Sequence, residues 1–148
     1  MPEENILKRL IKWAENQKEP SRTSFLVAII VNIIFIYVVN QLPYWNLSFI
    51  ASSWTQTLWI LNLSLIVTII GNVLFLLYNP QWFRSLAQIV MNAFVFLAIQ
   101  TLYNVFPFTL SSTMALVVVI LLILMMVGVF IAILVEVVKL VVILIPSN

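Results

Sequence analysis

The chain lacks cysteine and histidine, and all five of its acidic residues are glutamate. Cysteine, histidine and aspartate supply most ligands for zinc, copper, haem iron and iron–sulfur clusters, and the first two also carry thiol and imidazole catalysis. Without cysteine, neither a disulfide nor a reduced thiol indicates the redox compartment. We therefore expect no metal site, no cofactor and no enzyme activity built on these groups.

Charge is also scarce, since 8% of the 148 residues are charged and 64% are hydrophobic. Ordinary soluble domains are about a quarter charged and about half apolar. A soluble fold of this length cannot bury so much apolar surface, whereas helices in lipid can present apolar faces outward. The composition predicts an all-α integral membrane protein, with residues 1–148 as a single membrane domain and no nucleic-acid partner.

Four long apolar runs indicate transmembrane helices at about residues 24–41, 58–78, 85–105 and 114–135. Each is close to the ~20 residues that a helix needs to cross ~30 Å of hydrocarbon. Pro80 and Pro107 break the chain between runs. These runs predict a four-helix bundle.

The last apolar run continues to residue 145 and is interrupted only by Glu136 and Lys139. A straight helix over the whole run would reach roughly 48 Å, which exceeds the hydrocarbon thickness. The helix must therefore tilt, bend near Gly128 or leave the membrane. We favour an exit near Glu136, with the apolar helical extension meeting the N-terminal segment.

Residues 1–19 predict an amphipathic interfacial helix. Its apolar side chains recur at helical spacing, and Trp13 suits the lipid headgroup layer. We expect this helix to lie flat on the membrane surface. Residues 42–57 are uncharged and rich in aromatic side chains, and we expect them to form a loop in the opposite headgroup region.

The positions of lysine and arginine predict the orientation. Five of the seven precede the first span, Arg84 lies between the second and third, and Lys139 lies near the end of the fourth. With four spans, all seven fall on one side of the membrane. Because short cytoplasmic flanks carry the excess of positive charge, both termini are predicted to be cytoplasmic.

Glu136 and Lys139 form the first candidate site. They are three residues apart, so their side chains share one helix face and can neutralise each other. Charged residues inside a span mark a functional site by default. The depth of the pair distinguishes an interfacial anchor, which we favour, from a buried site that couples a proton, a cation or a partner.

Amide side chains form a second candidate site, an intramembrane polar network. Its members are Asn32, Asn62, Asn72, Gln88, Asn92 and Gln100, with Asn40 and Asn104 near span ends. We expect these amides to face inward and bond across helices as structural contacts; the alternative is a polar pathway or a headgroup site. Gly71 and Gly128 are the only glycines and are expected to permit close helix crossings.

An internal duplication would align the first span with the third at an offset of 60 residues, and would pair Asn32 with Asn92 and Asn40 with Gln100. Asn32 would then lie opposite Asn92. Apolar helices also resemble one another through restricted composition, which we favour as the explanation.

Two functions fit this sequence. The first is a structural or accessory subunit of a membrane complex, which predicts a membrane-protein partner at fixed stoichiometry. The alternative is an oligomeric channel or transporter, with Glu136 and the amides lining the path, which predicts a homo-oligomer. An enzyme acting on membrane lipids is disfavoured because Glu136 is the only acidic residue beyond the N-terminal segment. In each case the surroundings are membrane lipids.

Overall fold

The computed structural model describes residues 2–145, which form helices joined by short loops. The long helices are α2 (Arg22–Gln41), α3 (Leu58–Leu77), α4 (Gln81–Val105) and α5 (Ser112–Leu144), preceded by α1 (Pro2–Glu15). Four helical segments are long and apolar enough to cross a membrane. The predicted all-α architecture is confirmed, and the four long apolar helices suggest a multi-pass membrane protein.

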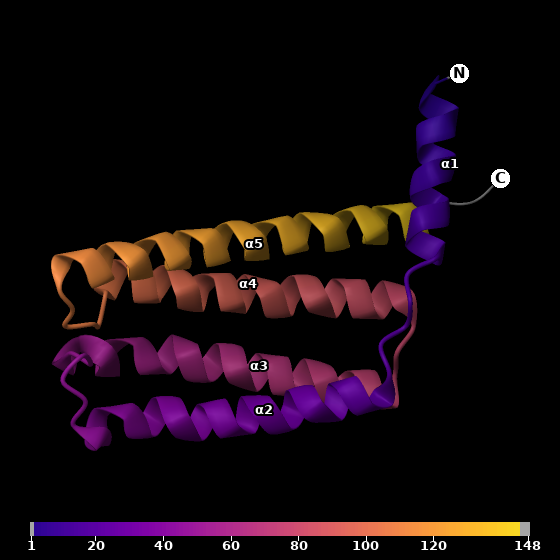
Figure 1. The fold of residues 1–148 in the computed structure, drawn as a ribbon. Helices are drawn as coiled ribbons and strands as arrows, with labels where there is room; N and C mark the ends of the chain where they lie inside the picture. Colours follow the sequence, from indigo (N-terminus) through magenta and orange to yellow (C-terminus); the bar gives the residue numbers. More distant parts are fainter. Residues whose placement is uncertain (1, 146–148) are drawn as a thin grey trace.

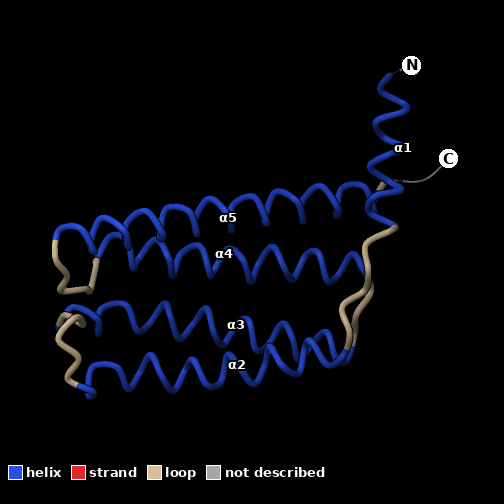
Figure 2. Tube along the Cα trace, in the orientation of Figure 1, coloured by secondary structure: helices blue, strands red, loops and turns tan. Residues whose placement is uncertain are grey.

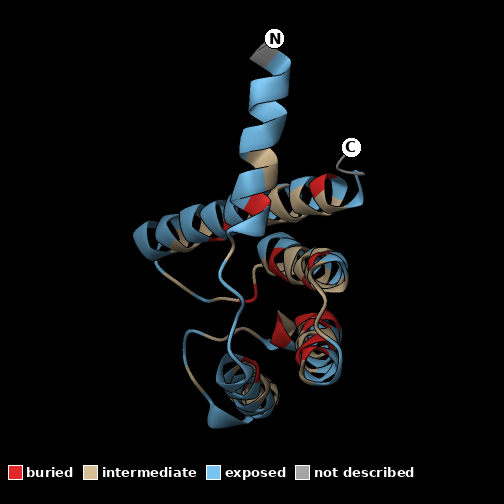
Figure 3. Ribbon diagram, turned by 90° about the vertical axis from the view of Figure 1, so that its right-hand side faces the viewer, coloured by how far each residue is buried: buried red, intermediate tan, exposed pale blue. Residues whose placement is uncertain are grey.

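The four long helices lie antiparallel in one open row, in chain order (Figures 1 and 3). Within residues 2–145, α2 packs on α3, α3 on α4 and α4 on α5, whereas α2 contacts neither α4 nor α5. The row therefore does not close into the compact bundle that the sequence suggested. Burial of an apolar face against protein gains little over burial against lipid tails, so nothing forces the outer helices together.

A small apolar core holds the first three helices of the row. Phe25 on α2, Phe75 on α3 and Met91 on α4 are all buried, and the two phenyl ring centroids are 5.3 Å apart. Such tilted aromatic pairs add favourable contact beyond the area that they bury. This core lies toward the end of the row that carries Arg22, Arg84 and Lys139, which we call the charged end.

Two helix boundaries differ from the predicted ones. α4 starts at Gln81 rather than 85. Pro80 before it takes the extended N-cap conformation, and the N–H that proline lacks would have no partner at the start of a helix. α1 ends at Glu15 rather than 19, since the residue before Pro20 is disfavoured in a helix. α5 continues for 33 residues without a break at Gly128.

α1 stands roughly at right angles to α5 and projects beyond it, with its C-terminal half packed against the last turns of α5, while the linker after α1 runs along the charged end to α2 (Figures 1 and 2). Ala14 on α1 and Val142 on α5 are both buried and line the same cavity. The predicted meeting of the apolar extension with the N-terminal helix is confirmed.

The opposite end has no charge and is closed by two loops. Residues 42–57 are not an irregular loop, because two 3-10 helices form there, η1 (Leu42–Trp45) and η2 (Ser52–Thr57). Ala51 N donates to Pro107 O at 3.0 Å and Thr109 N to Phe49 O at 2.9 Å. Buried Trp54 donates its Nε1–H to Val39 O at 2.9 Å. The two backbone bonds join the α2–α3 hairpin to the α4–α5 hairpin, and the Trp54 bond lies within the α2–α3 hairpin.

Candidate functional site

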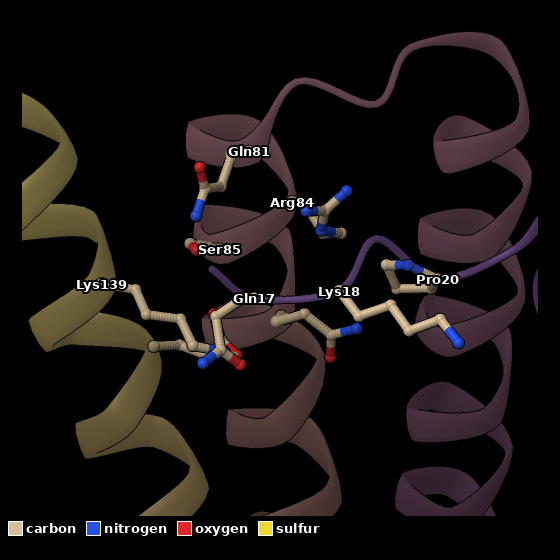
Figure 4. Close-up of a pocket in the computed structure, with 9 residues that line it drawn as sticks. Gln17, Lys18, Pro20, Gln81, Arg84, Ser85 and Lys139 are labelled. Carbon is tan, nitrogen blue, oxygen red and sulfur yellow. The ribbon is translucent and has the colours of Figure 1, made fainter. Parts of the chain in front are cut away.

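A polar cleft of about 110 Å³ opens at the charged end, where three segments meet. The linker after α1, the first two turns of α4 and the last part of α5 form its walls (Figure 4). Its lining residues are Gln17, Lys18, Pro20, Gln81, Arg84, Ser85, Gln88, Glu136 and Lys139. Three cations and one carboxylate therefore meet in a small space at the end of four apolar helices.

Glu136 and Lys139 form an ion pair in this cleft, with 2.8 Å between Lys139 Nζ and Glu136 Oε1. Each side chain is 17% exposed. Lys139 Nζ also lies 5.8 Å from the ring centroid of Trp13, within the range of a cation–π contact. The structure places the pair beside the start of α4, at the charged end of the row.

The linker is fixed in place by side-chain amides. Gln81 Nε2 on α4 donates to Ala14 O at 2.8 Å, and Gln17 Nε2 donates to Trp13 O at 3.2 Å. Both bonds are accepted by carbonyls in the last turn of α1, where backbone donors run out, and Ala14 O also accepts from Gln17 N at 3.5 Å. As a result, α1 and its linker form a wall of the cleft.

Ser85 is a buried residue in the wall of the cleft. It is 3% exposed, yet its hydroxyl makes no hydrogen bond with another described residue. In the described chain, every fully enclosed side-chain nitrogen or oxygen has a hydrogen-bond partner. The Ser85 hydroxyl has none, so it is not fully enclosed and has access to the cleft. In Figure 4, Gln81 and Ser85 lie on the side of α4 toward Lys139.

Glu136 and Lys139 were predicted as one site and Gln88 as part of another, and the structure brings all three to this one cleft. Ser85 and Lys18 were not predicted from the sequence as site residues. Arg84 did carry a signal, as the only charge in a link between spans, but it was interpreted for orientation alone. A single serine at a helix start carries no signal that would have marked it.

The amide network is much smaller than predicted. Asn40 and Asn62 bond to each other across α2 and α3. Asn32 and Asn72 instead donate to carbonyls of their own helices, Ala28 O at 2.7 Å and Thr68 O at 2.8 Å. Short polar side chains in helices commonly form such bonds to the preceding turn.

The remaining amides lie on α4. Gln88, Asn92, Gln100 and Asn104 make no side-chain hydrogen bond within residues 2–145. Asn32 does not lie opposite Asn92, because α2 and α4 do not touch. Gln100 and Asn104 are exposed. The positions that a duplication would pair are therefore not placed alike.

The two glycines also differ. Gly71 on α3 is buried, and a Cβ there would clash with Met91 Sδ on α4, so the predicted close crossing is confirmed. Gly128 on α5 has nothing within 4 Å of the place where its Cβ would be. The close crossing predicted at Gly128 is wrong, because α5 turns this face away from the row.

The polar cleft and the Asn40–Asn62 pair are thus the two places where polar side chains of the four long helices converge in the described part of the chain. The first combines charged groups and an unpartnered hydroxyl. The second is a closed structural contact. Comparison of the chain with protein-family models, with curated proteins and with solved structures finds no match.

Proposed function

We propose that this chain is a structural or accessory subunit of a membrane complex, and not an enzyme. The observation that carries the proposal is the open row. In the most apolar stretch of α2 and of α5, 6% of residues are buried, compared with 28% for α3 and 22% for α4. Each outer helix packs on one neighbour and leaves a broad apolar face uncovered by the described chain.

Unbonded amides on α4 favour a protein neighbour over lipid alone. Asn92 is the twelfth of the 25 residues of α4, which puts it close to mid-height, and its side chain makes no hydrogen bond in the described chain. An amide at that depth has no water to bond and gains from a polar group on an adjacent helix. A partner helix with such a group, packed along α4, would satisfy it.

The distribution of charge supports an orientation with both termini in the cytoplasm. Arg22, Arg84 and Lys139 lie at the charged end, together with the four basic residues before them. Basic residues concentrate on the cytoplasmic side of membrane proteins. In this orientation α1 lies at the cytoplasmic surface, with Ile6 and Leu7 exposed for insertion among headgroups.

The channel hypothesis has less support. Glu136 is paired with Lys139, and Asn32 and Asn72 donate to carbonyls of their own helices. These three of the groups that would line a path are therefore already bonded within the chain. A pore would also require several copies, because four helices in a row enclose no lumen.

Native mass spectrometry of the complex, extracted from its own membrane with lipids retained, tests the proposal. We expect a different membrane protein at fixed stoichiometry. Asn92→Leu should reduce recovery of that partner, whereas Asn32→Leu is the matched control, because Asn32 already bonds within its own helix. A complex made only of copies of this chain would contradict the accessory role and would make Glu136→Gln flux assays the next step.

A further inference from the structure

The polar cleft holds more positive charge than its one carboxylate can neutralise. Glu136 is paired with Lys139, whereas Arg84 and Lys18 have no carboxylate within 4.0 Å among the described residues. One Arg84 nitrogen donates to Asn79 Oδ1 at 3.0 Å. A guanidinium has five N–H donors in a planar fork, so most of them stay available.

The cleft also offers neutral donors that have no partner in the chain. Ser85 is 97% removed from the surface and unbonded, and the Gln88 amide on the next turn of α4 makes no bond either. The Ser85 hydroxyl is not enclosed, so it is free to donate to a group that enters the cleft. An oxyanion with several acceptor oxygens matches one hydroxyl, one amide and a guanidinium.

An apolar groove lies next to the polar cleft. Its lining residues are Leu10 and Trp13 of α1 and Ile131, Leu134, Val135 and Val138 of α5, and its volume is about 370 Å³. The groove and the cleft meet where Lys139 lies over the Trp13 ring. A basic polar cleft therefore adjoins an apolar groove in the angle between α1 and α5.

We propose that this end of the molecule binds one anionic glycerophospholipid, with its phosphate in the polar cleft and an acyl chain in the apolar groove. Arg84, Ser85 and Gln88 donate to the phosphate oxygens, and Lys18 adds positive charge from the linker wall of the cleft. Basic pockets between transmembrane helices at the cytoplasmic surface recognise anionic headgroups by the same chemistry. The lipid would join α1, α4 and α5 at one point. This inference goes beyond the accessory role and does not depend on it.

The experiment measures lipid binding to the purified full chain by native mass spectrometry, after titration with phosphatidylglycerol. Phosphatidylcholine tests the requirement for net negative charge, and inorganic phosphate as a competitor tests whether the acyl chains matter. We expect phosphatidylglycerol to bind in a one-to-one complex, more tightly than phosphatidylcholine. Inorganic phosphate should not displace it.

Three variants locate the site. Ser85→Ala and Arg84→Gln should each weaken phosphatidylglycerol binding by roughly tenfold, since each removes a hydrogen bond to a charged group. Lys8→Gln is the matched charge control, because Lys8 lies outside the cleft and is paired with Glu4. Ser85→Ala should leave the fold intact, since its hydroxyl has no partner in the chain.

Equal binding of the two lipids would overturn the proposal, as would unchanged phosphatidylglycerol binding in both cleft variants. Displacement by inorganic phosphate would show that the cleft binds free phosphate and would overturn the lipid assignment. The purified chain contains no partner subunit. These outcomes are therefore independent of whether Asn92 recruits one.

Discussion

Asn40 on α2 and Asn62 on α3 exchange two hydrogen bonds through their side-chain amides. Asn40 Nδ2 donates to Asn62 Oδ1 at 2.6 Å, and Asn62 Nδ2 donates to Asn40 Oδ1 at 3.0 Å. Asn40 Nδ2 also donates to Ile36 O at 2.7 Å. Because each amide satisfies the other, the pair fixes the register of α2 against α3 near the uncharged end.

A double-mutant cycle at this pair should show coupling. Asn40→Leu and Asn62→Leu each leave one amide without its partner, whereas the double variant leaves none. We expect a coupling energy of roughly 0.6–2 kcal/mol, measured by unfolding in mixed micelles with rising dodecyl sulfate. Asn104→Leu serves as control, since Asn104 is exposed and unbonded. Additive effects at Asn40 and Asn62 would show that the pair does not form.

Alanine substitution should separate the two glycines. Gly71→Ala forces Met91 out of a packed position and should destabilise the protein by about 1–3 kcal/mol. Gly128→Ala meets nothing and should be neutral or stabilising by up to ~1 kcal/mol, because glycine is a poor helix former. The same unfolding assay compares them. Addition of Met91→Ala should remove the clash at Gly71, and equal stability of the two single variants would contradict the close α3–α4 crossing.

Glu136→Gln should destabilise the charged end. The Lys139 side chain is 17% exposed, and the substitution leaves its ammonium beside Trp13 without a counter-charge. We expect this loss to cost on the order of 1–3 kcal/mol. Glu4→Gln breaks an ion pair whose side chains are 65–70% exposed and should change stability by less than ~1 kcal/mol. Glu136→Gln/Lys139→Gln should recover most of the loss. A double variant as unstable as the single one would show that the pairing is not what matters.

Ala14→Leu should detach α1 from the row. Ala14 is 1% exposed and lies against α5 and Gln81, so a larger side chain has no room. The chain contains no cysteine, and cysteines placed at Ile11 and Ile143, which line one cavity, would be the only pair present. A flexible bifunctional maleimide should crosslink them in the parent chain and far less in Ala14→Leu. Ile6→Leu, at an exposed position, should leave the crosslink unchanged.

The sequence predicted the helices well because lipid simplifies the problem. An uncharged run of about 20 residues has one stable form in hydrocarbon, and Pro80 and Pro107 mark where runs end. The start of α4 was placed four residues late, since Gln81, Trp82 and Arg84 resemble loop residues in composition. Their helical state depends on Pro80, which presets the first turn.

The arrangement of the helices could not be predicted in the same way. Apolar residues occupy every face of α2 and α5, so no separate hydrophobic stripe indicates which side meets a neighbour. The polar cleft could not be predicted either, because it forms only where α4 and α5 pack together. Glu136 and Ser85 are 51 positions apart in the sequence and become neighbours only because α4 and α5 pair.

The unbroken length of α5 couples events on the two sides of a bilayer. Its 33 residues extend about 50 Å, while the hydrocarbon core is ~30 Å thick. In a thinner membrane the helix must tilt further, and in a thicker one it stands more upright. Because α1 is packed on the end of α5, each change of tilt moves α1 relative to the headgroups. In a bilayer, the length of α5 would therefore link membrane thickness to the position of α1.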